Sequence, residues 1–562
     1  MKSIFPAVKP FLVALVALPV QLAAQGSTPA APSAGSILQQ VQPNPPAAAP
    51  IARPRLTIDR EGGSALPLSA AFPVKSVRIA GNTLFDTGTL HALVAEAEGK
   101  TLTLEQLGGY VACITDYYRA HGYPLAQAMI LAQVIQDGVL VIDVIEARYG
   151  EITFNNLSRV KGGLLQKTLS SLERSHPIEE DELNHALSLL SEIPGVAVNA
   201  TLKPGDAVGT SDLQVNAASG RTMSGSATLD TYGSRSTGKL RLSASVNFIN
   251  PLHHGDVLAI NGLSSGRGTN HGRVAYDSLV SGQGTRVGGS YSSLHYLLGS
   301  PFASLNAHGT AQLKSLWAKT PLKRGRRINL SGQLQYDALL LRDHIDAGAL
   351  RIDRHVDHGT VTLVADTRDS FFSGGITTAS IGWKTGRVAF DDPAAELSDA
   401  VTAGSAGAFS KWNMSIARLQ RLTERTSGYL SFAAQWANGN LDASEKMSAG
   451  GPSTVRAYDV GAVSGDSGFF GTAELRRDLG VAWNTRWQAV AFFDRAQLTI
   501  NRNTWLSGAN RVALTGAGVG LNIAAPKNWS AKISVATRVG SAPSLGGRTA
   551  SARGWLELSR GF

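Results

Sequence analysis

Cysteine and charge are both scarce in this sequence. Cys113 is the only cysteine in 562 residues, which excludes an intrachain disulfide and any CxxC metal site. It falls in an apolar pattern of helical spacing, so we expect a buried, structural thiol. Charged residues make up 17% of the chain, which is low for a soluble protein. The composition therefore favours neither a disulfide scaffold nor a typical soluble domain.

Long apolar runs are also missing. After the N-terminus we find no apolar window of the roughly 18 residues that a membrane-spanning helix needs. The first 26 residues differ, because Lys2 and Lys9 precede an apolar run at 11–20 and small residues around Ala24. This pattern is typical of a secretory signal peptide. For an exported chain, the net charge of +10 favours solvated loops and a polar lumen over a nucleic-acid-binding surface.

Residues 27–71 are rich in proline, alanine and serine. The stretch GSILQQVQ at 35–42 predicts a short helix, and QPNPPAAAPIARP at 42–54 predicts a linker that packs no core. We therefore expect this segment to connect domains rather than to belong to one.

Two small α+β units are predicted at 72–148 and 149–220, each in the order β-α-α-β-β. In the first unit, Thr103 and Gln106 form a capping-box pattern at a helix start. Asp137-Gly138 predicts a hairpin turn between two strands. The second unit repeats this order with its own helices and strands.

From residue 221 to 562 the helical periodicity stops. Short alternating runs are separated by Gly, Asn, Asp and Ser turns, and the segment divides into about 16 units of about 20 residues, as in an outer-membrane barrel. The chain ends on Phe562, and Leu558 and Leu556 share its face of the last strand. We expect a transmembrane β-barrel of about 16 antiparallel strands.

Three strings resemble enzyme motifs. GSRSTGK at 233–239 has phosphate-loop spacing, but Leu240 follows it and no helix is predicted there. GAGVGLN at 516–522 lies within a strand pattern, where small residues suggest close approach by a plug or loop. GDSG at 465–468 matches the segment around a serine-protease nucleophile, but no histidine segment of that class accompanies it. His253-His254 lacks a partner carboxylate at ligand spacing. We expect no enzyme activity, catalytic residue, metal or cofactor.

Several motifs together resemble a known family. FPVKSVRIAGNTLFD, DYYRAHGY and QDGVLVIDVIEARYGEI are similar to a first POTRA domain, and the segment from residue 229 is similar to the start of a TpsB barrel. VRAY at 455–458 resembles the VRG(Y/F) signature of that family. Together these motifs make the chain similar to two-partner secretion transporters (haemolysin secretion/activation proteins). The resemblance implies a barrel in the bacterial outer membrane, with POTRA domains in the periplasm.

The resemblance implies roles for individual residues. A loop would fold back into the barrel lumen, where Arg456 would form a charge pair with Asp494. The implied anchor and its supporting motif comprise Val455, Arg456, Ala457, Tyr458, Asp494, Gly465, Asp466, Gly468, Glu474, Phe492 and Phe493. Phe562 would be read by the barrel-assembly machinery. Ala457 and Ala496 stand where the family has glycine, and Arg560 stands where an aromatic or apolar residue is expected.

The resemblance also implies the partners. POTRA domains would capture one unfolded client, a large β-rich adhesin, cytolysin or exoenzyme, and the barrel would secrete it without nucleotide hydrolysis. The remaining partners would be outer-membrane lipid and the assembly machinery, with no nucleic acid. An assembly factor of the same superfamily is the first alternative, although such factors usually carry more POTRA units. A passive porin is the second, although a porin does not need the α+β units.

Overall fold

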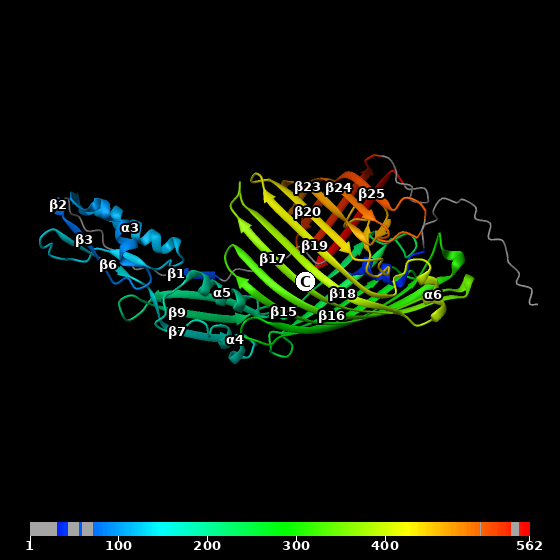
Figure 1. Ribbon diagram of the computed structural model, residues 1–562, viewed down its shortest axis with the longest axis horizontal. Helices are drawn as coiled ribbons and strands as arrows, with labels where there is room; N and C mark the ends of the chain where they lie inside the picture. Colours follow the sequence, from blue (N-terminus) through cyan, green and yellow to red (C-terminus); the bar gives the residue numbers. More distant parts are fainter. Residues whose placement is uncertain (1–30, 43–54, 59–70, 506, 541–549) are drawn as a thin grey trace, which may run out of the picture.

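The computed structural model describes residues 31–42, 55–58, 71–505, 507–540 and 550–562. The expected signal peptide and most of the proline-rich linker lie outside these residues. Two small α+β units occupy one end of the molecule, and a large barrel occupies the rest (Figure 1). No helix in the described ranges is long and apolar enough to cross a membrane.

The first unit packs helices on a small sheet. Its elements are β2 (Ala71–Val74), β3 (Ser76–Ala80), α2 (Thr87–Ala92), β4 (Lys100–Thr103), α3 (Leu104–Ala120), β5 (Gln127–Met129) and β6 (Val139–Ile145). The predicted capping box starts α3, because the Thr103 and Gln106 side chains each accept the other's backbone N–H. Apolar residues at helical spacing, Leu107, Ile114 and Tyr118, then point into the core.

Two expectations for the first unit were wrong. Cys113 is exposed rather than buried, because the buried face of α3 runs through Val111 and Ile114 on either side of it. The strand expected directly before the Asp137-Gly138 turn is much shorter, since β5 ends at Met129. Both turn residues do adopt positive φ, 54° and 77°.

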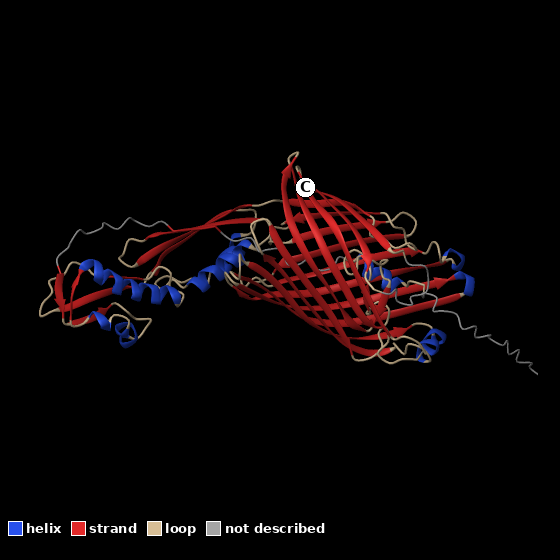
Figure 2. Ribbon diagram, turned by 90° about the horizontal axis from the view of Figure 1, so that it is seen from above, coloured by secondary structure: helices blue, strands red, loops and turns tan. Residues whose placement is uncertain are grey.

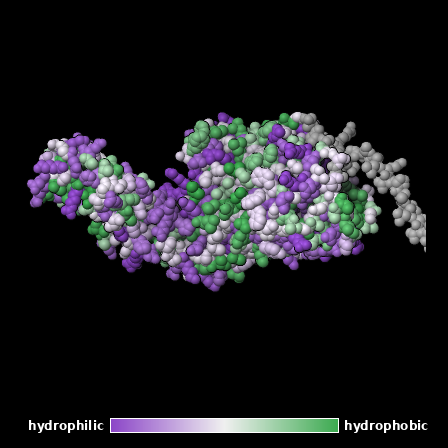
Figure 3. Space-filling model, in the orientation of Figure 1, coloured by the Kyte–Doolittle hydropathy of each residue, from purple (hydrophilic) through white to green (hydrophobic). Residues whose placement is uncertain are grey.

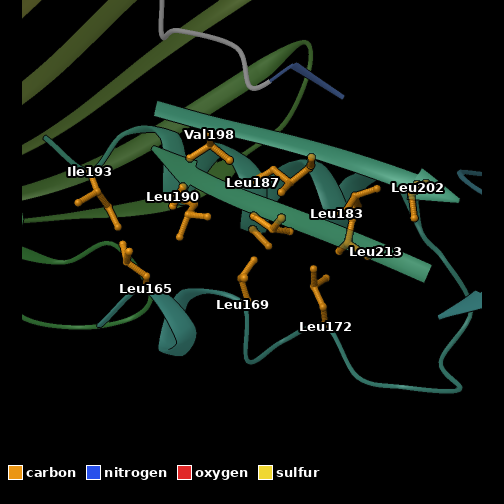
Figure 4. Close-up of a cluster of buried hydrophobic side chains, with 14 of the residues drawn as sticks. Leu165, Leu169, Leu172, Leu183, Leu187, Leu190, Ile193, Val198, Leu202 and Leu213 are labelled. Carbon is orange, nitrogen blue, oxygen red and sulfur yellow. The ribbon is translucent and has the colours of Figure 1, made fainter. Parts of the chain in front are cut away.

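The second unit has the predicted order of elements. It comprises β7 (Arg148–Leu157), α4 (Gly162–Thr168), α5 (Glu180–Ser191), β8 (Val196–Pro204) and β9 (Thr210–Ser219). Figure 4 shows its core, in which leucines of α5 such as Leu183, Leu187 and Leu190 face Leu213 of β9 and Leu165 of α4. This alternation of apolar residues at helix and strand spacing explains why the pattern predicted the unit.

The linker was expected to pack no core, and this was wrong for Arg55–Ile58. These residues form β1, which pairs in parallel with β8 from Asn199 to Leu202. The sheet order is therefore β1-β8-β9-β7. The Leu-Thr-Ile sequence within β1 favours a strand, and Leu56 packs against the core of the second unit.

The barrel closes from 16 antiparallel strands, as the sequence predicted. Figure 2 shows them tilted around a common axis. The strands are β10 (Met223–Asp230), β11 (Arg241–Ile249), β12 (Val257–Ser264), β13 (Thr269–Leu279), β14 (Arg286–Leu297), β15 (Ala307–Arg324), β16 (Ile328–Ile345), β17 (Leu350–Asp369), β18 (Gly375–Phe390), β19 (Gly407–Arg421), β20 (Thr426–Ala437), β23 (Ser467–Ala482), β24 (Thr485–Thr499), β25 (Arg511–Ala525), β26 (Trp529–Arg538) and β27 (Ala552–Gly561). β27 pairs with β10, and Phe562 exchanges two backbone hydrogen bonds with Gly225.

Side chains alternate between the outside and the lumen. Trp383, Trp412 and Trp436 lie opposite one another on three adjacent strands and face outward, whereas Lys384 and Lys411 beside them face the lumen. Hydrophobic residues gather across the barrel wall, and the α+β units are largely hydrophilic (Figure 3). An apolar band with aromatic residues is the pattern of a membrane-spanning barrel.

Contacts with the second unit identify the two ends of the barrel. Arg324, where β15 ends, donates to Glu192 at 2.6 Å between Nε and Oε1. His253, in the turn between β11 and β12, accepts a backbone hydrogen bond from Lys161. The turns between β11 and β12, β13 and β14, and β15 and β16 therefore lie beside the units, and the opposite connections lie at the far end.

Candidate functional site

The longest of these far-end connections is the segment 438–466, which joins β20 to β23 and is called the lumen loop here. It contains a short hairpin of β21 (Met447–Ala449) and β22 (Val463–Gly465). The loop folds back against the inner wall, because Val455, Ala457 and Tyr458 are all buried in one cluster with Val490 and other inward residues of β24–β26.

Arg456, at the centre of the lumen loop, binds two carboxylates on the inner wall of the barrel. Its Nε and Nη2 lie 2.8 and 2.6 Å from the two oxygens of Asp494, and its backbone N–H donates to the same carboxylate at 3.1 Å. Its Nη1 donates to Glu474 Oε1 at 2.8 Å. Asp494 is fully buried and Arg456 is 12% exposed. A bidentate guanidinium–carboxylate pair at such a site holds a loop in one orientation.

Neighbouring side chains make further contacts with Arg456 and with its two carboxylate partners. Its guanidinium lies over the ring of Phe492, with Cζ 3.4 Å from the centroid, and Trp555 Nε1 donates to its carbonyl at 2.7 Å. Thr472 Oγ1 donates to Asp494 Oδ1 at 2.8 Å. Arg476 donates to the other oxygen of Glu474. Three strands, β23, β24 and β27, therefore hold one loop residue.

The two departures from the family glycines are accommodated without backbone strain. Neither Ala457 nor Ala496 has a positive φ. Room for the Ala457 methyl group is made on β25, where a Cβ added to Gly516 would lie 2.6 Å from Ala457 Cβ. The expectation that small residues of 516–522 admit a loop is thereby confirmed for Gly516, whereas a Cβ at Gly518 or Gly520 would meet the barrel wall.

The GDSG segment forms a corner between two strands. β22 ends at Gly465 and β23 begins at Ser467, and Gly468 has a φ of 155°. Asp466 is fully buried and binds Lys446 Nζ at 2.7 Å, while its oxygens accept the backbone N–H groups of Leu441 and Arg502. It thus joins the lumen loop to the next far-end connection.

Ser467 makes no protease-like contact. Its Oγ accepts the backbone N–H of Ala437 at 3.0 Å, and among the described residues no histidine hydrogen-bonds it. His358 of β17 binds Glu445 of the lumen loop rather than Ser467.

Two other predicted residues face outward rather than into the lumen. Phe493, expected as part of the supporting motif, is 44% exposed on the outer wall, because it alternates with the inward Phe492 and Asp494, so it does not support the anchor from inside the lumen. Phe562 is 52% exposed at the end of β27. Arg560 on the same face lies 5.5 Å from the ring centroid of Trp529, where its charge reaches the membrane interface.

The sequence did not predict a second cluster of charged residues, which is centred on Glu445 of the lumen loop. Glu445 is 2% exposed and lies 2.8 Å from Lys411, 3.0 Å from Lys384 and 3.2 Å from His358. The two lysines each follow or precede a tryptophan, so the alternation of the strand already turned them toward the lumen. Nothing in the sequence indicated that their carboxylate partner lay on a loop.

The predicted short helix is α1 (Ala34–Val41), and it lies inside the barrel (Figure 1, dark blue). Ile37 and Leu38 pack on Leu294, Tyr296 and other inward residues of β14–β16. The Ala34 N–H donates to Asp343 Oδ1 at 2.6 Å, a favourable place for a carboxylate because a helix N-terminus carries partial positive charge.

The same network ties α1 to the lumen loop. Asp343 binds Arg354 at 2.8 Å, and Arg354 binds Asp442 of the loop at 2.6 Å. Gln39 donates directly to the carbonyl of Ser444. Helix, wall and loop therefore share one buried chain of contacts.

Two known protein families match the sequence, and both agree with this architecture. Residues 209–523 match the family described as haemolysin secretion/activation protein ShlB/FhaC/HecB. Residues 72–147 match the ShlB-type POTRA domain. The first match covers more than half of the chain and includes the whole lumen loop.

Individual relatives are similar over most of their length. The heme/hemopexin transporter protein HuxB of Haemophilus influenzae (strain 86-028NP) is 26% identical over 472 residues, covering 83% of each chain. The outer membrane transporter CdiB of Escherichia coli O6:K15:H31 is 25% identical, covering 80% of this chain and 76% of that protein. The solved structure of CdiB from Escherichia coli superposes with a TM-score of 0.69 at 21% identity, over 90% of this chain and 93% of that one.

Proposed function

The chain belongs to the haemolysin secretion/activation family of the ShlB/FhaC/HecB type and is an outer-membrane transporter of two-partner secretion, and we propose how its parts divide the work. The α+β units capture an unfolded client in the periplasm. The barrel passes it outward, while the lumen loop and α1 occupy the pore at rest. The observation that carries this proposal is the buried contact of both loop and helix with the inner wall.

Client capture uses a free sheet edge of the first unit. In the described residues β5 pairs only with β6, so its other side offers unpaired backbone groups to an extended chain. The corresponding edge of the second unit, β8, already carries β1. Leu131 and Val134, just beyond β5, are 52% and 84% exposed and provide apolar contacts for client side chains.

The Arg456 anchor keeps the lumen loop at a fixed position on the inner wall while a client passes. An unpaired loop in a wide pore has no strand ladder to hold it, so the bidentate contact with Asp494 supplies a fixed point. The α1 helix is only eight residues long and is not a strand of the barrel, so it can leave the pore without unfolding the barrel.

Transport in this scheme needs no nucleotide. GSRSTGK at 233–239 lies in the far-end connection between β10 and β11 rather than before a helix, so it offers no helix N-terminus to a phosphate. Folding of the client outside the cell then drives the process, because a folded β-rich chain cannot return. Biogenesis of the transporter itself uses Phe562 as the mark for the barrel-assembly machinery.

The test is site-specific photocrosslinking in cells that also produce a large exported β-rich protein encoded beside this gene. A photoreactive residue at Val134 is expected to crosslink that client during secretion. A photoreactive residue at Val208, 92% exposed in the second unit, is the matched control. Equal crosslinking at both positions, or none at Val134 while the client is secreted, contradicts capture at β5.

A further inference from the structure

The outer wall of the barrel contains a cavity of about 530 Å³ at the far end of β24 and β25. Two arginines, Arg495 and Arg511, line it together with Phe493, Thr515 and Val539. None of its lining residues is acidic. A cavity with two cations and no carboxylate favours an anionic occupant.

Both arginines point away from the lumen. Arg495 follows Asp494, which is buried against the lumen loop, and precedes the buried Ala496, so strand alternation turns Arg495 outward. Arg511 precedes the buried Val512 in the same way. Both side chains are exposed. Among the described residues neither guanidinium has a hydrogen-bond or ion-pair partner.

The cavity lies where two strands part. β25 pairs with β24 along its whole length, but in the described ranges β26 pairs with β25 only from Gly516 onward. Val539 still donates its backbone N–H to the Thr515 carbonyl at 3.0 Å, so among the described residues only Arg511–Leu514 of β25 lack a ladder partner on that side. Tyr458 of the lumen loop lines the bottom of the opening.

Apolar side chains lie on the unit-facing side of the cavity. Phe493, Val519 and Val535 face outward and are 44%, 65% and 50% exposed. These belong to the membrane-facing band, so the two arginines are just beyond it at the end opposite the periplasmic units. That position corresponds to the headgroups of the outer leaflet.

We propose that this cavity binds the phosphate groups of an anionic outer-leaflet glycolipid, as in the lipid A portion of lipopolysaccharide. Guanidinium groups match phosphate oxygens with two parallel hydrogen bonds. Arg495 on β24 lies opposite Thr515 on β25. Arg511 precedes Thr515 by four residues and lies on the same face of β25, so the two arginines are separated by roughly 13 Å along the strand direction. Each arginine therefore meets its own phosphate.

Among the described lining residues of the cavity, Tyr458 is the one that belongs to the lumen loop. The site therefore joins the outer leaflet to the anchored segment of the lumen loop. The inference requires only the outer-membrane location of the chain and is independent of how a client is captured.

The experiment measures lipid binding to the full-length purified protein by native mass spectrometry. The probes are bisphosphorylated lipid A, the same lipid after removal of its phosphates, and inorganic phosphate. The variants are Arg495→Gln, Arg511→Gln and the double variant. Arg477→Gln is the matched control, because Arg477 is an exposed outward arginine of β23 near the periplasmic end.

Bisphosphorylated lipid A is expected to bind the wild type, with affinity reduced about tenfold by each cavity substitution and changed less than about twofold by Arg477→Gln. Removing the phosphates should weaken binding as the double variant does. Equal binding of lipid A by the wild type and the single variants would overturn the proposal, as would equal binding of the dephosphorylated lipid. Displacement of lipid A by millimolar inorganic phosphate would assign the cavity to free phosphate and reject the lipid.

Discussion

Arg456 and Asp494 are 38 residues apart in sequence and are joined by two side-chain hydrogen bonds of 2.8 and 2.6 Å inside the barrel. The pair connects the lumen loop to β24 at a place where Asp494 has no contact with solvent. Such a contact is costly to break, because removing one partner leaves the other charge buried without compensation.

Replacing Arg456 with alanine is expected to reduce secretion of the client at least about tenfold while the barrel still assembles. The loss of about 3–5 kcal/mol that follows the breaking of a buried pair falls on the loop rather than on the strands. Secreted client and heat-modifiable mobility of the barrel are measured together. Arg456→Lys, which keeps the charge and loses the bidentate contact, should be intermediate, and normal secretion by Arg456→Ala would refute the anchor.

The double variant Arg456→Ala with Asp494→Ala separates a lost contact from an orphaned charge. Each single variant leaves one charged partner of the Arg456–Asp494 pair buried without the other. The double variant removes both partners, so its defect should be no larger than that of the worse single variant. The measurement is accessibility of the lumen loop to added protease in whole cells. Defects that simply add would mean that the two residues act independently.

Asp466 and Ser467 offer a matched pair within the GDSG corner. Ser467→Ala removes one acceptor, worth about 1 kcal/mol, and should leave secretion nearly unchanged. Asp466→Ala removes the carboxylate partner of Lys446 and the acceptor of two backbone N–H groups, so it should make the lumen loop sensitive to protease. A larger effect from Ser467→Ala than from Asp466→Ala would contradict the structural role assigned to this corner.

Docking of α1 depends on the absence of a side chain at Gly35. An added Cβ would lie 2.6 Å from Ser444 Cβ and 2.9 Å from Ser444 Cα, so Gly35→Val should displace the helix and raise the conductance of the channel in planar bilayers. Gly108→Ala on α3, where nothing lies within 4 Å, is the control. Unchanged conductance for Gly35→Val would show that α1 does not block the pore.

The first unit should lose local stability in acid through Glu146. Burial raises the pKa of this carboxyl, but hydrogen bonds from Thr83, Leu84 and Tyr118 outweigh it, so the pKa lies below the ordinary value of 4.5. The stabilisation is therefore present above about pH 4.5 and is lost as pH falls through the lower folded value. The protection factor of the Leu84 amide against hydrogen exchange, which corrects for the pH dependence of the intrinsic rate, should fall over that range, and Glu146→Gln should remove most of this pH dependence.

Local patterns predicted most of the architecture. The apolar spacing of α3 and α5 indicated helices, and the alternation of Trp383 with Lys384, or of Phe492 with Phe493, already contained the two faces of the barrel wall. Cys113 was misplaced because helical spacing near Val111 and Ile114 specifies a face only to within one residue. Phe493 was assigned to the supporting motif because FFD was treated as a unit, although adjacent strand residues point in opposite directions.

The sequence by itself determined the two repeated α+β units, the barrel and the residues of the VRAY and FFD motifs, because these depend on short-range periodicity and on motif identity. Only the tertiary structure decided that β1 pairs with β8, that Glu445 meets Lys384 and Lys411, and that Gly516 makes room for Ala457. These are contacts between segments far apart in the chain. No local preference encodes such contacts, because they arise when barrel closure fixes where each strand and loop can reach.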